Sequence, residues 1–242
     1  MVEAPNKILD KTYEAPQSVI LSFKIEKEQF SEFENMSKPN KAYLTFKRVF
    51  DFCAATAALI VLSIPMLIIS LIIRATSKGS AIFVQKRVGK NGKVFNMYKF
   101  RTMFATTPKY LATADIDDPE KYITKIGKLL RKFSLDELPQ IINIVKGDMS
   151  IIGPRPLIPE ESNIHEIRQE LGIYQLRPGM TGWAQVNGRD SVLPHQKVWY
   201  DACYLRDIGI KMDAKIFFIT LKKVLGAIDV VEGSESFEQN DN

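Results

Sequence analysis

The hydrophobic pattern of the chain is dominated by one long apolar run from Val49 to Ile73. Lys47 and Arg48 precede this run, and Arg74 and Lys78 follow it. A helix of about 20 apolar residues is long enough to cross a bilayer. Because basic residues flank both ends, the usual cytoplasmic excess of Lys and Arg gives no orientation to a simple span. A helix that enters the leaflet and returns to the same face would keep both basic ends at one surface.

Two residues inside the run, Ser63 and Pro65, favour this re-entrant arrangement. Proline removes a backbone hydrogen bond and bends a helix. We therefore expect a re-entrant membrane helix over residues 46–78, with its break at Ser63 and Pro65. A straight span and a buried core helix of a soluble domain are the alternatives, and the length of the run argues against the second.

A β-hairpin is predicted directly after the apolar run. Asn91-Gly92 lies between two runs rich in apolar and aromatic residues, which is the strongest short-range signal for a hairpin. Lys90 and Lys93 at the turn suit a solvated edge that resists aggregation. Lys99 and Arg101 alternate on one strand face, so they are better placed to bind an anion.

Two adjacent carboxylates, Asp136 and Glu137, lie near the start of a predicted helix. Ser134 and Glu137 have the spacing of a capping box, which would make the acidic pair part of an ordinary helix start. Pro139 fits poorly inside such a helix and favours a helix that begins at Pro139 itself. The carboxylates would then precede the helix, beside N–H groups that can also bind a phosphate. The local pattern leaves both alternatives open.

Short helices and turns rich in Gly and Pro make up the rest of the chain. Helical patterns cover residues 122–132, 160–171 and 198–228. The last pattern combines lysines with an apolar face, which suits either an anionic membrane surface or the domain core. Arg155, in a stiff Gly-Pro-Arg-Pro turn, is suited to bind phosphate or carboxylate, although it could also be merely solvated.

Residues 176–190 contain three glycines, two arginines and Trp183. Glycines allow a backbone to approach a ligand closely. The segment lacks the lysine of a phosphate-binding Walker loop and the spacing of a dinucleotide fingerprint, so neither motif applies.

Composition narrows the class of partner. With 242 residues, the chain can hold one domain and an extension. Its net charge of +5 favours an acidic partner, but the cations form no recognisable nucleic-acid module. Cys53 and Cys203 lie far apart, which indicates a reducing compartment. We expect residues 1–45 to be an N-terminal extension of unknown role without signal-peptide features, and residues 232–242 to be a disordered acidic tail.

Several segments occur in an order that is specific. They are Lys47-Arg48 with Phe50-Asp51, KNGKVFNMYKFRTM, SLDELPQIINIVKGDMSIIGPRP, LRPGMTGWAQVNGR, and finally Asp201, Tyr204 and Asp213. Together they resemble the bacterial sugar transferase family of monotopic phosphoglycosyl transferases, over residues 43–231. The resemblance implies a mostly helical α+β membrane protein with a re-entrant helix hairpin, a small β-hairpin and amphipathic interfacial helices. Residues 79–231 would form its cytoplasmic catalytic domain.

The resemblance also implies a reaction. A sugar 1-phosphate would pass from a nucleotide diphosphate sugar, usually a UDP-sugar, to undecaprenyl phosphate with release of UMP, as the initiating step of exopolysaccharide, O-antigen or glycan synthesis. Asp136 would attack the sugar-bearing phosphorus and form an aspartyl-phosphosugar intermediate, assisted by Glu137. Mg²⁺ bound by Asp136 and the diphosphate would screen their charges. The residues expected to bind substrate are Lys99, Arg101, Arg131, Arg155, Arg189 and Asp213.

The same resemblance places the protein at the cytoplasmic face of the bacterial inner membrane, with both ends in the cytoplasm. Its partners would be the two substrates and inner-membrane lipid, without nucleic acid. Ile64 separates Ser63 from Pro65, so the proline is the better supported half of the helix break. The alternatives are a non-catalytic membrane-surface partner of a polysaccharide assembly complex and direct glycosyl transfer with release of UDP. The sugar, the pathway and the oligomeric state, a homodimer included, stay open.

Overall fold

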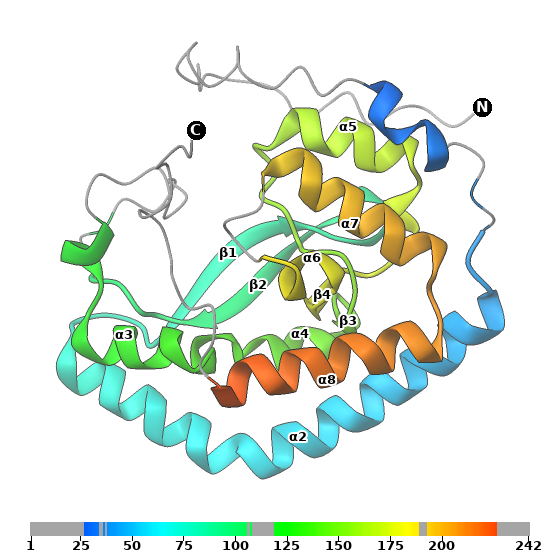
Figure 1. Cartoon of the computed structure of the whole chain (residues 1–242). Coiled ribbons are helices and arrows are strands. Elements are labelled where there is room, and N and C mark those ends of the chain that lie inside the picture. Colours follow the sequence, from blue (N-terminus) through cyan, green and yellow to red (C-terminus); the bar gives the residue numbers. More distant parts are fainter. Residues whose placement is uncertain are drawn as a thin grey trace.

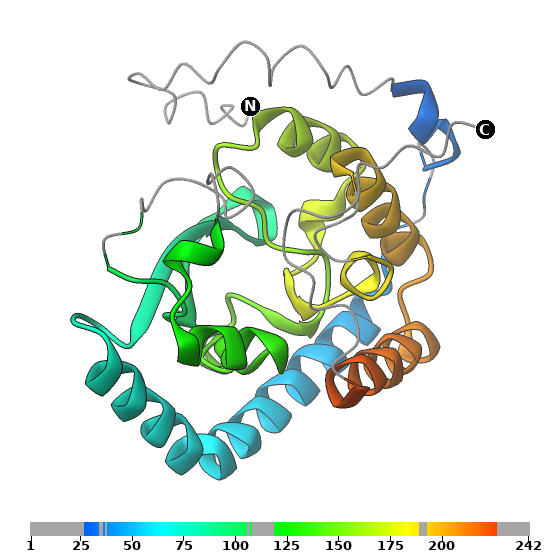
Figure 2. The same ribbon diagram turned by 60° about the vertical axis from the view of Figure 1, so that its left-hand side comes forward.

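A single long helix runs along one side of the molecule, and the other elements lie on its concave side (Figures 1 and 2). This computed structural model describes residues 27–33, 36, 38–105, 107, 119–188 and 193–226. Arg189, the predicted acidic tail and most of the predicted N-terminal extension lie outside the described residues.

The long helix is α2 (Lys41–Thr76), which is bent midway (Figure 1). It begins at Asn40, whose side-chain oxygen accepts hydrogen bonds from the backbone N–H groups of Ala42 and Tyr43. Pro65 lies inside the helix and has no N–H to donate to the preceding turn. The Ser63 hydroxyl donates to the carbonyl of Ile60 at 2.7 Å. The structure therefore contains the bent helix that the sequence predicts, extended at its N-terminal end.

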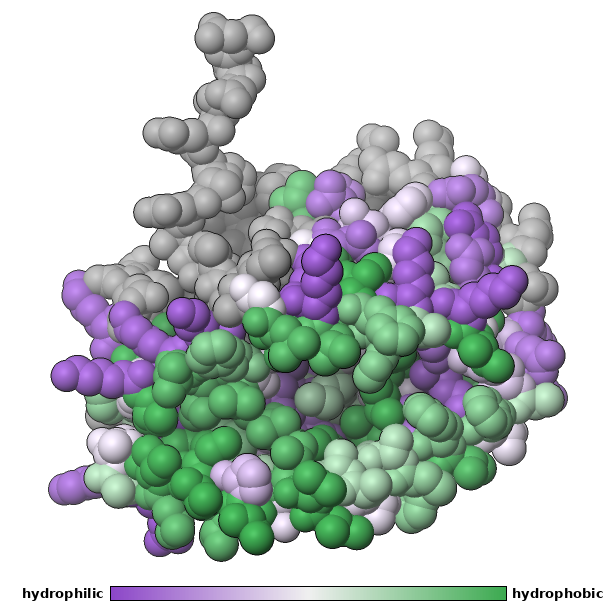
Figure 3. All heavy atoms as spheres, turned by 60° about the horizontal axis from the view of Figure 1, so that its bottom comes forward, coloured by the Kyte–Doolittle hydropathy of each residue, from purple (hydrophilic) through white to green (hydrophobic). Residues whose placement is uncertain are grey.

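Most of α2 is exposed. Among the described residues it is the one helix long and apolar enough to cross a membrane, and only 11% of its most apolar window is buried. It is therefore not the core helix of a soluble domain. Apolar side chains of α3 (Lys125–Lys132) and α8 (Ile210–Gly226) are also exposed and extend the apolar face shown in Figure 3. The exposed apolar side chains on the three helices include Ile60, Val61, Ile64, Leu129, Phe218 and Leu225.

The predicted hairpin is confirmed. Strands β1 (Ile82–Val88) and β2 (Val94–Phe100) pair antiparallel. The turn between them is the short 3₁₀ segment η2 (Lys90–Gly92), in which Asn91 and Gly92 have φ values of 57° and 71°. Two successive left-handed residues match the right-handed twist of the flanking strands, which explains the Asn-Gly preference.

A second, parallel sheet joins β3 (Ser150–Ile152) to β4 (Gly179–Thr181), and the sequence pattern did not predict it. Glycines in and beside this sheet allow two backbone segments to lie very close together. A Cβ atom at Gly179 would lie 2.1 Å from the backbone nitrogen of Gly153, and one at Gly182 would lie 2.0 Å from its carbonyl oxygen. The idea that these glycines admit a ligand is therefore wrong for Gly179 and Gly182, because the approaching backbone belongs to the protein.

The remaining helices cover the two sheets. The helical pattern predicted over residues 198–228 is two helices, α7 (Pro194–Arg206) and α8, separated at residues 207–209. The predicted helix over residues 160–171 is α5 (Ser162–Glu170). The other described elements are η1 (Lys27–Phe33), η4 (Pro119–Tyr122), η5 (Leu135–Glu137), α4 (Gln140–Lys146), α5 (Ser162–Glu170), η6 (Ile173–Gln175) and α6 (Trp183–Val186).

Three clusters of buried side chains hold the fold together. The largest joins η1, α5, α7 and α8 to β3. The second packs α4 between α2 and β2, and the third packs α3 and the hairpin on the C-terminal half of α2. Both halves of α2 therefore contact the same domain, through Ala55 before the bend and Met66 and Ile73 after it.

Candidate active site

The two adjacent carboxylates lie on η5, a single turn between α3 and α4. Ser134 has a left-handed backbone with φ 54°, and within the described chain its side chain makes no capping hydrogen bond to this turn. Helix α4 begins only after Pro139. The capping-box alternative is therefore wrong, and Asp136 and Glu137 precede the helix. A left-handed non-glycine residue costs about 1–3 kcal/mol and is typical of functional turns.

Lys99 lies directly beside this acidic turn. Its ammonium group is 3.0 Å from Oε1 of Glu137. The Lys99 and Glu137 side chains are only 23% and 18% exposed, so solvent screens the pair incompletely. Strand β2 thus supplies a cation to the acidic turn. The sequence predicted that Lys99 and Arg101 could both bind an anion, and Lys99 is the one that contacts a carboxylate here.

Asn143 fixes α4 against β2, and sequence reasoning missed it. Its side chain is fully buried, donates to the carbonyl of Asn96 at 2.7 Å, and accepts from the backbone N–H of Tyr98 at 3.0 Å. These two bonds lie one and three residues before Lys99. They fix the position of α4 along β2, and this position determines how close Glu137 lies to Lys99.

The opposite end of α4 is capped by two arginines. Arg48 of α2 donates to the carbonyls of Ile144 and Val145 at 2.7 and 3.1 Å, and Nε of Arg177 donates to the carbonyl of Gly147 at 2.9 Å. Cations at a helix C-terminus stabilise the helix dipole. The positive N-terminal end of α4 is left beside the acidic turn.

Arg131 is held next to the same strand. It lies in the last turn of α3, and its Nε donates to the Thr102 hydroxyl at 2.9 Å, three residues beyond Lys99. Thr124 donates to the Thr102 carbonyl, and a Cβ at Gly127 would lie 2.0 Å from that carbonyl oxygen. Only a glycine allows α3 to pack this closely, so Arg131 is held against Thr102, which follows the strand that carries Lys99.

Arg101 points to a different part of the molecule. Its guanidinium donates to the carbonyls of Ser77 and Lys78 at 2.9 and 2.8 Å and to the Ser77 hydroxyl at 2.7 Å. These contacts anchor the C-terminal end of α2. The structure therefore separates Arg101 from Lys99, because β2 ends at Phe100 and Arg101 follows the strand.

Arg155 lies on the loop after β3, and that loop is tied down on both sides. The guanidinium of Arg168 donates to the Arg155 carbonyl at 2.8 Å and forms an ion pair with Asp201 in which both side chains are almost fully buried. Arg87 donates to the Pro156 carbonyl at 3.1 Å. Burial raises the pKa of the Asp201 carboxyl above its usual value, and the charge of Arg168 opposes this shift.

Asp213 belongs to a junction of helices. Its carboxylate accepts hydrogen bonds from Tyr43 and Tyr204, both at 2.7 Å, and Lys47 lies 2.5 Å away. Burial and the neighbouring carboxylate raise the pKa of Tyr43. These contacts join α8 to α2 and α7, and they explain structurally why Lys47, Tyr204 and Asp213 occur together in the sequence.

The acidic turn can contribute to a metal site but does not complete one. Within the described part of the chain, no three His, Cys, Asp or Glu side chains gather to hold a metal ion. Mg²⁺ is commonly bound by one or two carboxylates together with substrate phosphates and water. The residues present therefore fit a magnesium ion whose coordination is completed by a diphosphate.

Comparison with known proteins covers most of the chain. The family model described as bacterial sugar transferase matches residues 42–227. "Uncharacterized sugar transferase EpsL" of Bacillus subtilis is 37% identical over 182 residues, which are 75% of this chain and 88% of that protein. "Exopolysaccharide production protein ExoY" of Sinorhizobium fredii is 35% identical over 192 residues, 74% of this chain and 84% of ExoY.

Other relatives are much longer. "UDP-glucose:undecaprenyl-phosphate glucose-1-phosphate transferase" of Escherichia coli is 40% identical over 187 residues, which are 73% of this chain but 39% of that protein. The chain thus spans most of some relatives and less than half of others. The match over residues 42–227 includes the acidic turn, its cations and the bent helix, and this chain belongs to the bacterial sugar transferase family.

Proposed function

We propose that this protein transfers a sugar 1-phosphate from a UDP-sugar to undecaprenyl phosphate and so initiates the synthesis of an exopolysaccharide or related glycan. Its family makes it a phosphoglycosyl transferase. The observation that carries the proposal is the turn Asp136-Glu137 at the head of α4, with Lys99 3.0 Å from Glu137. A nucleophilic carboxylate and a phosphate-binding helix start meet there.

The names of the relatives support this class of substrate but do not select the sugar. Relatives that are each 35% identical are named for undecaprenyl-phosphate transfer of glucose in Komagataeibacter xylinus, galactose in Salmonella typhimurium and N-acetylgalactosamine in Aeromonas hydrophila. Equal identity to proteins named for three sugars means that overall similarity does not determine the donor.

The chemistry is a double displacement at one phosphorus. An oxygen of the Asp136 carboxylate attacks the sugar-bearing phosphorus, and the bond from that phosphorus to UMP breaks, so that UMP leaves with the bonding electrons. A phosphate oxygen of undecaprenyl phosphate then attacks the same phosphorus. The bond to Asp136 breaks, the carboxylate is restored, and the product is an undecaprenyl diphosphate sugar.

The neighbouring residues make an anionic nucleophile compatible with an anionic substrate. Lys99 pairs with Glu137, so that the two adjacent carboxylates present less negative charge to the diphosphate. Arg131 and Arg155 are the arginines that we propose to hold phosphate oxygens, together with Arg189. Arg101 and Asp213 act through the anchoring contacts described above.

Metal dependence is typical of the family. Mg²⁺ held by Asp136 and the diphosphate oxygens would screen the repulsion between them and stabilise charge on the transferred phosphoryl group. Glu137 then serves to orient the site through its bond to Lys99.

We further propose that α2 is a re-entrant membrane helix. Its first turns are tied to the domain by Lys47 and Asp213, and its last turn by the bonds from Arg101 to Ser77 and Lys78. A straight span would place its ends on opposite sides of about 30 Å of hydrocarbon. Because both ends contact one domain, the bend at Pro65 returns the chain to the face from which it entered. That face is the cytoplasmic side of the inner membrane.

Cysteine labelling tests this topology. Lys41→Cys and Lys78→Cys introduce exposed thiols at the first residue of the helix and just after its last, in a Cys53→Ser background because Cys53 is itself exposed. We expect a membrane-impermeant maleimide to label both positions only after the cytoplasmic face is opened. Labelling of one position in intact cells and the other only in lysed cells would contradict the re-entrant helix.

Nucleotide release tests the reaction. Detergent-solubilised protein is incubated with a panel of UDP-sugars, with undecaprenyl phosphate and Mg²⁺ present or omitted. We expect UMP from one donor when both are supplied, and loss of turnover in Asp136→Asn with membrane association retained. Asp207→Asn, an equal change at an exposed position, is the control. Release of UDP would indicate direct glycosyl transfer, and full activity in Asp136→Asn would exclude the proposed nucleophile.

A further inference from the structure

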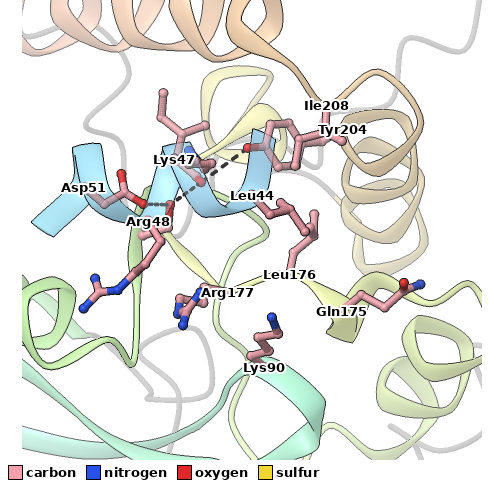
Figure 4. Close-up of a pocket in the computed structure, with 12 residues that line it drawn as sticks. Leu44, Lys47, Arg48, Asp51, Lys90, Gln175, Leu176, Arg177, Tyr204 and Ile208 are labelled. Carbon is pink, nitrogen blue, oxygen red and sulfur yellow. Dashed lines mark hydrogen bonds between the residues drawn. The ribbon is translucent and has the colours of Figure 1, made fainter. Parts of the chain in front are cut away.

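Figure 4 shows a basic depression whose lining includes Arg48 and Arg177, the two arginines that cap the C-terminal end of α4. Its wall includes Lys47, Arg48 and Asp51 of α2, Lys90 of the hairpin turn, and Gln175 and Arg177. Helix α4 has seven residues and is therefore about 10 Å long. The depression is thus separate from the carboxylates that precede α4, and it plays no part in the transfer chemistry proposed above.

Two of its charged residues are already neutralised by neighbours. Lys47 is paired with Asp213 at 2.5 Å. Asp51 accepts hydrogen bonds from the Ser150 hydroxyl at 2.6 Å and from the backbone N–H of Ile151 at 3.3 Å. Figure 4 shows the Asp51 carboxylate turned away from Lys90 and Arg177. Among the described residues, these contacts leave the other three cations without a carboxylate of their own.

Within the described part of the chain, Arg48 and Arg177 donate their hydrogen bonds to backbone carbonyls, and the Arg48 guanidinium also lies 5.7 Å from the centre of the Phe52 ring. Both cap the C-terminal end of α4, which carries about half an elementary negative charge. This partial charge does not balance two guanidinium groups. A further cation, Lys90, then faces them from the hairpin (Figure 4).

Lys90 is the residue that sequence analysis assigned to a solvated edge, and the structure corrects this. Its side chain is half-buried in the depression, and it makes no hydrogen bond or ion pair with any described residue. Burial and the nearby charge of Arg177 lower the pKa of Lys90, while burial and Arg48 lower the pKa of Arg177. Like charges held together in this way are relieved by a bound anion.

We propose that Lys90, Arg48 and Arg177 form a second anion site, which binds a phosphate group. Two planar guanidinium groups and one ammonium group match the several oxygens of a phosphate better than they match a single acceptor. The neighbouring residues Val49 and Phe50, on the outer side of the same turns of α2, are exposed on the apolar face. The phosphate belongs either to a lipid headgroup or to a soluble phosphate.

Charge reversal at Lys90 provides the test. Lys90→Glu removes the cation and supplies a carboxylate to Arg177 in place of the ligand. The control is Lys93→Glu, which makes the same change in net charge on the same turn at an exposed position. We expect Lys90→Glu to have a melting temperature equal to or above that of the wild type in the absence of phosphate. If the melting temperatures of Lys90→Glu and Lys90→Gln are both below that of the wild type, the cations do not repel one another as proposed.

Binding is measured as the rise in melting temperature with inorganic phosphate, against chloride at equal ionic strength. Phosphate at the substrate site contributes equally to all three proteins, so differences between them report the depression. We expect an affinity about tenfold weaker in Lys90→Glu, because a charge-assisted contact is lost, and an unchanged affinity in Lys93→Glu. The phosphate affinity of Lys90→Gln should lie between those of Lys90→Glu and Lys93→Glu. If Lys90→Glu does not fold, a weaker phosphate affinity in Lys90→Gln than in the wild type is the result to look for.

Nanodiscs separate the two sources of phosphate. If the ligand is a lipid headgroup, soluble phosphate will raise the melting temperatures of all the proteins equally. Nanodiscs of phosphatidylglycerol, compared with nanodiscs of phosphatidylcholine, will then stabilise the wild type and Lys93→Glu but not Lys90→Glu. Equal responses of all three proteins to both soluble phosphate and phosphatidylglycerol would overturn the proposed site.

Discussion

The buried ion pair between Arg168 and Asp201 makes a strong prediction about stability. Both side chains are almost completely inaccessible, at 1% and 0% exposure. Asp201→Asn keeps the shape of the side chain but removes its charge, which leaves the guanidinium of Arg168 buried without a counterion. Breaking a buried pair in this way costs about 3–5 kcal/mol. For a protein of this size, this corresponds to a fall in melting temperature of roughly 6–20 °C.

The exposed pair of Arg206 and Asp207 provides a matched control. These side chains are 45% and 50% exposed, and their closest approach is also a hydrogen-bonded contact. Exposed pairs contribute about 0–1 kcal/mol, so Asp207→Asn should shift the melting temperature by no more than a few degrees. Thermal unfolding of the solubilised proteins in one detergent gives both values.

The same variant also tests the position of Arg155. Arg168 holds the Arg155 carbonyl, so loss of Asp201 should loosen the loop after β3 and raise KM for the donor more than it lowers kcat. The double variant Arg168→Met with Asp201→Leu should be more stable than Asp201→Asn, because apolar replacement of both partners leaves no buried charge. Equal stability losses for Asp201→Asn and Asp207→Asn would refute this reasoning.

Two further predictions concern the site and pH. Lys99→Met should lower kcat/KM about 10- to 100-fold with little loss of stability, because a charge-assisted contact to Glu137 is removed. Lys93→Met is the exposed control. An unchanged kcat/KM in Lys99→Met would exclude a role for Lys99. Burial lowers the pKa of His165, whose ring contacts the Tyr174 hydroxyl and the Ile158 carbonyl. The neutral ring therefore stabilises the fold above its unfolded pKa of about 6.5, and this contribution is lost as pH falls through the lower folded pKa. The wild type should lose more melting temperature than His165→Gln between about pH 7.5 and pH 5.5; equal losses would contradict it.

Local signals in the sequence were sufficient for several elements. The apolar run and Pro65 predicted a long bent helix, and Asn91-Gly92 predicted the hairpin turn. These features depend on residue types that constrain their own backbone, through a missing N–H or a left-handed conformation. The order of the motifs was also sufficient to predict the family, because each motif is contiguous.

The acidic turn was an intermediate case. The spacing of Ser134 and Glu137 and the presence of Pro139 supported two different helix starts. Contacts with another part of the chain decide between the two helix starts, because the hydrogen bonds that join Asn143 to Asn96 and Tyr98 fix where α4 lies against β2. A local pattern that fits two conformations is decided by whichever one the tertiary contacts satisfy.

The partner of each charged side chain was determined by the tertiary structure alone. Lys99 and Arg101 are two residues apart and were predicted to share a strand face, yet one contacts Glu137 and the other the end of α2. Arg48 caps a helix end 96 residues later in the chain. Lys90 is half-buried against Arg177 although a hairpin turn is usually solvated. A sequence specifies which groups carry charge, but Coulomb energy and burial depend on distances in space, which only the packed fold sets.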